Sequence, residues 1–153
     1  MDVTLINPFL DAIAEIFPQI GFQALEKKSV SLKQAVVTNP GVTIDIGVTG
    51  PYQGTVLIRM GTEEAKKFAS TMMMGMQVTE LNSIAQSAIS EMGNMVCANA
   101  CTRFSKAGIS GLNISPPVLL IGEGSQVSMS IPKAVDIEFS VDGIPVDVCV
   151  GLC

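Results

Sequence analysis

The stretch ELNSIAQSAISEMGNMVCANACTRFSK, from Glu80 to Lys106, decides the architecture of this chain. Successive residues of a helix are about 100° apart, and at that spacing the apolar side chains gather on one face. The members of this face, which we expect to turn toward the core, are Leu81, Ile84, Ala85, Ala88, Met92, Met95 and Val96. Thr79 is the expected N-cap, and Lys106 followed by Gly108 is the expected end. The stretch therefore predicts one long central helix.

The opposite face of the same helix is small and nearly uncharged. Its members are Ser83, Ser87, Ser90, Asn94, Cys97, Ala98 and Cys101, with Glu91 at the border of the face. Glu91 is the only charged residue between Leu81 and Thr102, whereas a solvated helix face usually carries several Lys and Glu. Such a face suits close packing against another molecule. The plainer alternative is that Glu91 is a surface charge, Asn94 is a polar residue on the back of a helix, and the bare face is an oligomer contact.

Shorter helices and alternating apolar patterns flank this helix. Helical spacing is found at residues 3–17, closed by Pro18, and at 62–75, closed by Gly75. Strand patterns occur at 30–38, 42–48 and 55–60, which predict a three-stranded meander, and at 118–121, 126–131, 136–141 and 144–150. This order predicts an α+β fold, an antiparallel sheet with helices packed on one side and loosely duplicated halves. We expect a single domain over residues 1–153.

Charge and composition exclude several classes of function. The chain has 153 residues, a net charge of −5, nine Lys plus Arg and no His. Proteins that bind the nucleic-acid backbone need a basic stripe, so we expect no nucleic-acid partner. Without His, the usual general base and the Ser-His and Cys-His nucleophile pairs are missing. Any enzyme here must work without imidazole.

Hydropathy and cysteines bear on location and metals. The mean hydropathy is +0.46, yet no run of about 18 apolar residues occurs, so we expect no membrane association. Nothing at the start suggests export, and we place the protein in the cytoplasm with its four cysteines reduced. The pairs Cys97 with Cys101 and Cys149 with Cys153 could bind a soft metal, but without His we expect no metal site. The methionines at 72–74 and 76 are expected to fill the core, with a soft-ligand site or an adaptable groove as the alternatives.

The segment 88–95, AISEMGNM, resembles the CheX-type chemotaxis phosphatases, whose signature is a Glu-x-x-Asn on a long helix. Similar elements of that family match INPF at 6–9, TGPYQG at 49–54, MMGM at 73–76 and SPP at 115–117. The resemblance therefore covers most of the chain.

This resemblance implies a phosphatase that docks on a phosphorylated CheY-like response regulator and hydrolyses its aspartyl phosphate. Asn94 would hold a water molecule in line with the phosphorus, and Glu91 would pair with the active-site lysine of the receiver. The small neighbours that would let the helix approach closely are Ser87, Ser90, Cys97 and Ala98. The receiver would bring its own Mg²⁺, so no cofactor belonging to this chain is implied.

Two further expectations follow from the same family. CheC-type relatives carry a second Glu-x-x-Asn on the first helix, but here Pro18 stands where the Asn after Glu15 would be, so one active site is expected. The resemblance, together with the apolar alternation at 144–150, which would need a covered edge, predicts a homodimer. The alternative function is a non-catalytic protein that binds a response regulator or belongs to a flagellar-switch complex, since the related switch proteins lack the catalytic pair.

Overall fold

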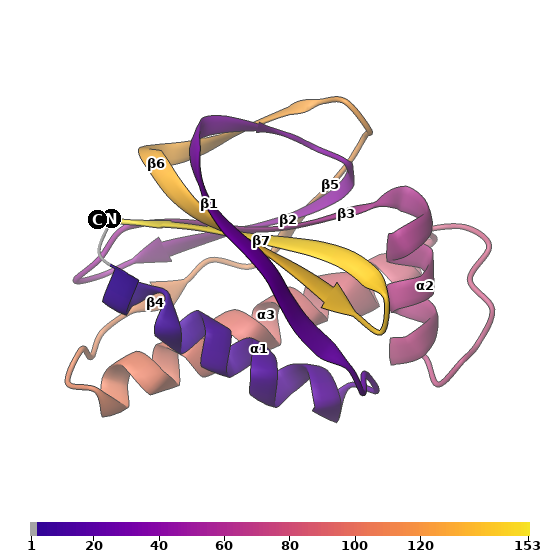
Figure 1. The fold of residues 1–153 in the computed structure, drawn as a ribbon, viewed down its shortest axis with the longest axis horizontal. Coiled ribbons are helices and arrows are strands. Elements are labelled where there is room, and N and C mark those ends of the chain that lie inside the picture. Colours follow the sequence, from indigo (N-terminus) through magenta and orange to yellow (C-terminus); the bar gives the residue numbers. More distant parts are fainter. Residues whose placement is uncertain (1–2) are drawn as a thin grey trace.

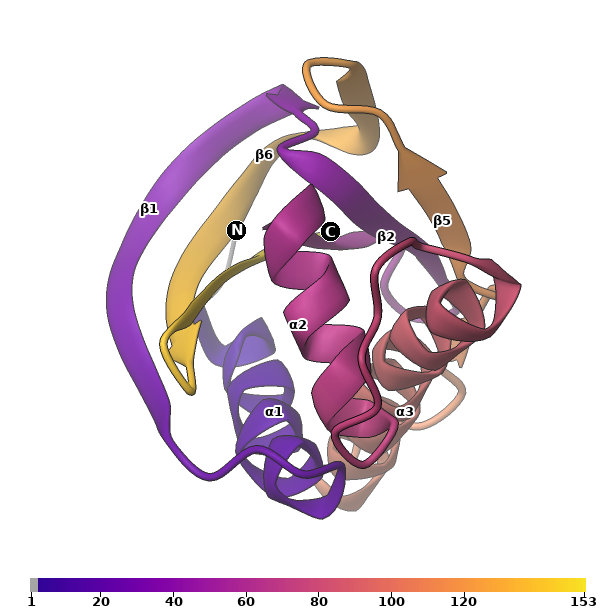
Figure 2. The same cartoon turned by 90° about the vertical axis from the view of Figure 1, so that its right-hand side faces the viewer.

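The computed structural model describes residues 3–153 as a seven-stranded antiparallel sheet with three α-helices on one face (Figure 1). The strand order is β1-β6-β7-β3-β2-β4, and β5 also pairs with β2. The helices are η1 (Val3–Leu5), α1 (Asn7–Gln19), α2 (Thr62–Met72) and α3 (Ser83–Lys106). The strands are β1 (Leu25–Thr38), β2 (Gly41–Thr49), β3 (Gly54–Gly61), β4 (Asn113–Ile114), β5 (Val118–Ile121), β6 (Gln126–Val141) and β7 (Ile144–Leu152). Figure 2 shows β1 and β5 at opposite borders of the curved sheet, with the helices on its concave face.

The long helix α3 is confirmed, but its start differs from the expected one. Asn82, not Thr79, is the N-cap, and its side chain accepts a hydrogen bond from the Ala85 N–H at 2.9 Å. Asn is a strong N-cap because its short side chain reaches the free N–H groups of the first turn. Arg103 and Lys106 occupy the last turn, where positive charge is favourable.

The buried face of α3 is rotated from the expected one. Ile84, expected in the core, is 64% exposed, whereas Cys97, expected outside, is fully buried. The residues that α3 buries are Ala85, Ile89, Met92, Gly93, Val96, Cys97, Ala100 and Phe104. The helix contacts both α1 and β2, so it is covered on two sides. Its small residues Gly93 and Ala100 are buried in these contacts, which a count of large apolar residues does not detect.

The two shorter helices also differ from expectation in detail. α1 continues through Pro18 to Gln19, because proline lacks the N–H for only one helical bond and the Ile20 N–H again bonds to the Ile16 carbonyl. In the methionine cluster, Met72 and Met73 are partly buried, but Met74 is 97% and Met76 63% exposed. The expectation that all four fill the core is wrong for the last two, which follow the end of α2.

The sheet corrects the predicted pairing of its strands. β2 and β3 form the expected hairpin, but β1 pairs with β6 along its length, so the predicted three-stranded meander is wrong. The two strands expected at 126–131 and 136–141 are one strand, β6, which runs through Pro132. Pro132 falls where the register between β1 and β6 is irregular, so its missing N–H breaks no regular pair.

The longest strands also cover part of the second face of the sheet. The C-terminal half of β1 and the N-terminal half of β6 bend over this face (Figure 1), and a small apolar cluster lies beneath them. Its members are Val37, Leu57, Val127, Met129, Ala134 and Cys149. β7 is central, between β6 and β3, so the alternation at 144–150 needs no further cover and does not support a dimer. The border strand is β1, which exposes Val30, Leu32 and Val36.

No helix within the described residues is both long enough and apolar enough to span a membrane.

A buried ion cluster lies on the second face of the sheet. The Arg59 guanidinium donates to the Thr38 carbonyl at 2.9 Å and lies 3.3 Å from the Asp136 and 3.4 Å from the Asp147 carboxylate. Burial, followed by the nearby negative charge of Asp136, raises the pKa of Asp147 from 3.8 to about 6. Between these values the folded protein binds more protons than the unfolded chain. The stabilisation from Asp147 is therefore complete below its ordinary pKa and is lost as the pH rises through about 6.

We predict that Asp147→Asn flattens the pH dependence of stability. From pH 5 to 7.5 the parent should lose about 1 kcal/mol of unfolding free energy relative to the variant, a value reduced because about a third of this side chain remains in water. Urea unfolding at both pH values measures this. Glu123→Gln, at an exposed turn, is the control and should keep the slope of the parent. Equal slopes for the parent and Asp147→Asn would show that Asp147 titrates at an ordinary pH.

Candidate functional site

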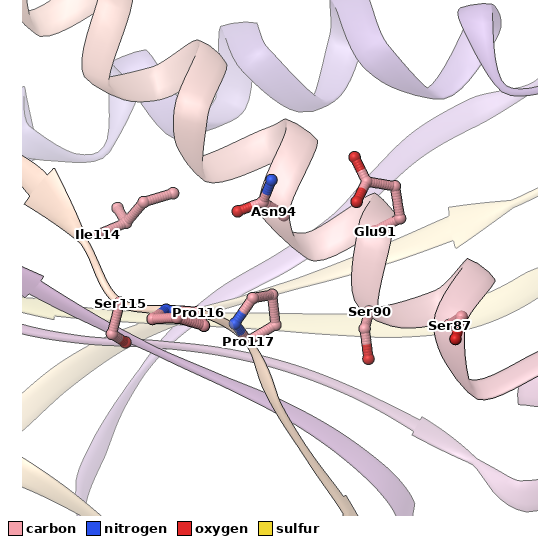
Figure 3. Close-up of a pocket in the computed structure, with 8 residues that line it drawn as sticks. All are labelled: Ser87, Ser90, Glu91, Asn94, Ile114, Ser115, Pro116 and Pro117. Carbon is pink, nitrogen blue, oxygen red and sulfur yellow. The ribbon is translucent and has the colours of Figure 1, made fainter. Parts of the chain in front are cut away.

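A groove of about 480 Å³ lies between the outer side of α3 and the segment at 114–117 (Figure 3). Its lining residues are Ser87, Ser90, Glu91, Asn94, Ile114, Ser115, Pro116 and Pro117. In the sequence the two walls are separated by about three turns of α3 and the connection that follows it, and they meet only because both pack on the same sheet. The groove is open along its length.

Glu91 and Asn94 form the polar part of the helical wall. Their spacing of three residues places them about 60° apart around the axis and about 4.5 Å along it. Figure 3 shows both side chains projecting from the same side of α3, while the Ser90 side chain points away from Glu91. Glu91 is exposed and Asn94 is half-buried. Within residues 3–153, neither side chain has a hydrogen-bond or ion-pair partner, so both are free to bind another molecule.

The opposite wall is held by strand β2. Gly47 N–H donates to the Ser115 hydroxyl at 2.7 Å, and Ser115 N–H donates to the Gly47 carbonyl at 2.9 Å. β4 and β5 pair with β2 on either side of this point, so residues 115–117 bulge between two anchored strands. Pro116 and Pro117 have fixed φ angles and no N–H groups, which makes the bulge stiff.

The charge of the groove comes from one residue, because Glu91 is the only ionisable side chain among the lining residues. The groove therefore favours a cation and offers no base other than this carboxylate. Within the described residues, one group of three acidic side chains is close enough to share a metal ion, namely Asp136, Glu138 and Asp147. That group lies on the second face of the sheet, beside Arg59, and is not part of the groove.

The structure brings together most of the residues singled out in the sequence. Ser87, Ser90, Glu91 and Asn94 all line the groove, and Ala98 is exposed on the next turn of α3. Cys97 does not belong with them. Its side chain is fully buried, and burial raises the pKa of its thiol, so the expectation that Cys97 lies at a partner surface is wrong.

Sequence reasoning missed the second wall of the groove as part of the site. In the sequence, residues 115–117 stand out only as an element shared with a family, and nothing in them indicates that Asn94 is a neighbour. The available signal was local: a Ser followed by two prolines predicts a rigid turn with a free hydroxyl. Its position across from α3 depends on pairing with β2.

Glu15, the residue that could have started a second Glu-x-x-Asn, is engaged within the fold. Its carboxylate accepts hydrogen bonds from Asn99, at 3.0 Å, and from Arg103. These bonds, that from Asn99 first, lower the pKa of Glu15. Glu15 therefore helps to join α1 to α3, and Pro18 lies three residues beyond it.

A family model and a curated relative match this chain. The family described as "Chemotaxis phosphatase CheX" matches residues 42–139. A curated relative, the CheY-P phosphatase CheX of Thermotoga maritima, is 27% identical over 128 residues, which are 83% of this chain and 81% of the relative.

Two solved structures share the fold. A chemotaxis protein CheX from Desulfovibrio desulfuricans has a TM-score of 0.84 at 19% identity and covers 98% of each chain. A CheX-CheY-BeF3-Mg²⁺ complex from Borrelia burgdorferi has a TM-score of 0.78 at 22% identity and covers 99% of each chain.

Proposed function

Because the chain belongs to the CheX family of chemotaxis phosphatases, we propose that it hydrolyses the aspartyl phosphate of a CheY-like response regulator through Glu91 and Asn94. The observation that carries the proposal is the groove. It presents a carboxylate and an amide, both without internal partners, from one side of α3. The Thermotoga relative, a CheY-P phosphatase, supports the same reaction class.

The chemistry needs little from this chain. An acyl phosphate is already an activated group, and phosphoryl transfer depends mainly on positioning and on stabilising charge. The Asn94 amide can donate and accept hydrogen bonds, so it can hold a water molecule in line with the phosphorus. This role requires no histidine, and the chain has none.

We infer that the receiver supplies the metal ion. The Borrelia complex contains CheY, BeF3 and Mg²⁺ together with CheX, and BeF3 has the shape of a phosphoryl group. The groove itself has a single carboxylate, which is too few ligands for a dedicated Mg²⁺ site. In this proposal Mg²⁺ enters the groove as part of the phosphorylated receiver, which is the substrate.

Glu91 and its small neighbours fit the docking step. As the only charge in the groove, Glu91 suits a cation on the partner, and the active-site lysine of a receiver is the expected one. Ser87, Ser90 and Ala98 have short side chains along the same helix, which allows a close approach of the partner to Asn94.

We predict that Asn94→Ala separates binding from hydrolysis. Groups that position reacting atoms typically contribute roughly 10² to 10³ in rate, whereas one hydrogen bond adds about 1 kcal/mol to a contact. The dephosphorylation rate at saturating protein should fall by that factor, while affinity for a BeF3-loaded receiver changes less than about tenfold. Asn7→Ala, at an exposed position of α1, is the matched control. A parallel fall of rate and affinity would make Asn94 a binding residue only.

We predict that Glu91→Lys weakens docking. A lysine facing the lysine of the receiver replaces an attraction with a like-charge contact, and affinity for the BeF3-loaded receiver should fall at least about tenfold at low salt. Glu123→Lys changes the net charge equally at a remote turn, so it reports any effect of total charge. Binding of Glu91→Lys as tight as that of Glu123→Lys would make Glu91 an ordinary surface residue.

The alternative is a non-catalytic protein that binds a response regulator or belongs to a switch complex. It can be distinguished from a phosphatase by the amount of protein needed to change the lifetime of the phosphorylated receiver. A phosphatase shortens the lifetime of the phosphorylated receiver when present at far lower concentration than the receiver. A binding protein gives stoichiometric protection or no change at all, and either result would favour this alternative.

We also propose that the chain forms a homodimer through β1. One edge of this 14-residue border strand pairs with no described strand. The strand also exposes three apolar side chains, Val30, Leu32 and Val36. Unprotected edges of this kind favour pairing with a second copy.

The dimer can be tested by light scattering. The parent should have twice the chain mass at micromolar concentration, and Leu32→Lys should shift it to the monomer mass. Val118→Lys changes another exposed apolar residue, on the opposite border strand β5, and should remain dimeric. A monomeric parent would remove the proposal, and loss of the dimer in Val118→Lys alone would place the contact at β5.

A further inference from the structure

Gly93 lies between the two groove residues in the sequence but faces the opposite way, onto β2. A Cβ atom added at Gly93 would lie 2.9 Å from Ile44 Cγ2 and 3.2 Å from Ile46 Cδ1. Carbon atoms in ordinary contact are about 3.5 to 4.0 Å apart, so even a methyl group does not fit. At this position the backbone of α3 rests directly on the side chains of β2.

At the shorter of these contacts the neighbour cannot move away easily, because Ile44 Cγ2 is a methyl group on a branched Cβ. Ile44 and Ile46 are fully buried, and β2 is paired on both sides at Ile44, with Ile58 in β3 and Leu119 in β5. β-branched side chains are also stiff at χ1. A side chain at position 93 would therefore move α3 away from β2 and would not displace the strand.

The same strand holds the other wall of the groove. Ser115 is bonded to Gly47 of β2 through both its hydroxyl and its backbone, one residue beyond Ile46. β2 thus supports α3 through Gly93 and the 115–117 bulge through Gly47. The distance between the walls is set by how closely each one approaches this strand.

We propose that Gly93 is a positioning residue, which sets the height of Asn94 above β2 and hence its reach into the active site of the receiver. The inference rests on the proposed phosphatase function. Asn94 follows Gly93 directly in a rigid helix, so a rise of α3 at Gly93 moves the Asn94 amide by nearly the same amount. The 115–117 wall does not follow, because its hydrogen bonds to Gly47 are independent of the helix.

The test is Gly93→Ala, measured as kcat and KM for the phosphorylated receiver. To reach ordinary contact distance the helix must shift by about 0.5 to 1 Å. Misplacement of about 1 Å can cost about 10² in rate, so kcat should fall roughly 10- to 100-fold while KM changes little. Alanine favours helix more than glycine does, so α3 itself should form, which far-UV circular dichroism and a thermal melt check.

Combining Gly93→Ala with a second substitution distinguishes a clash with β2 from a general structural effect. Ile44→Ala removes both atoms of Ile44 that the added methyl group would meet, Cγ2 and Cδ1. In that background Gly93→Ala should lower kcat less than about threefold, because the helix can settle back toward the strand. Crystal structures of the parent, Gly93→Ala and the double variant report the Asn94 Cα to Gly47 Cα distance, which should increase and then return.

The outcomes are distinct. A Gly93→Ala variant with the kcat of the parent, or with an unchanged Asn94 to Gly47 distance, would overturn the inference. So would a loss of rate that Ile44→Ala does not relieve, because the residue would then have only a general structural role. A parent that does not act on phosphorylated receivers would instead remove the proposed function, and the inference with it.

Discussion

Helix α3 packs closely on strand β2, and at Gly93 the backbone of the helix lies directly against the side chains of Ile44 and Ile46. β2 pairs with β3 on one side and with β4 and β5 on the other, so it is the strand through which the second half of the chain joins the first. The start of β2 is fixed by the buried Asn39, whose side chain accepts from Gly41 N–H and donates to the Leu120 carbonyl. A shift of β2 would therefore move the helix, the bulge at 115–117 and the groove between them.

This packing also separates the two functions of α3. Met92 and Gly93 face the core, while Glu91 and Asn94, their neighbours in the sequence, face the groove. A rigid helix with one face buried holds polar groups at defined positions with little conformational freedom to lose. Such a site suits a reaction limited by the placement of water, since it requires geometry more than proton transfer.

The second face of the sheet has a different physical character. Its polar centre contains Arg59 with Asp136 and Asp147, and three of the buried polar atoms there, Thr43 Oγ1, Arg59 Nε and Asp136 Oδ2, have no hydrogen-bond partner within the described residues. Removing charges from water is unfavourable unless they are fully paired, so this cluster makes stability depend on pH. The groove lies on the helical face, and Glu91 is the only charge among its lining residues, so this pH dependence and the candidate site reside in different parts of the molecule.

Local patterns in the sequence determined most of the helices and strands and singled out Glu91 and Asn94 as candidate site residues. Helical periodicity placed Glu91 and Asn94 on one side of α3, and the Asp142-Gly143 turn, with φ angles of 49° and 81°, joins β6 to β7 as its residue types require. Only the tertiary structure decided that Cys97 is buried and Ile84 exposed, because α3 packs against both α1 and β2 and these contacts bury its small residues. It also decided that β1 pairs with β6 and that Ser115 meets Gly47, 68 residues away. These outcomes depend on contacts between distant segments, whose energies arise only when the whole sheet has assembled.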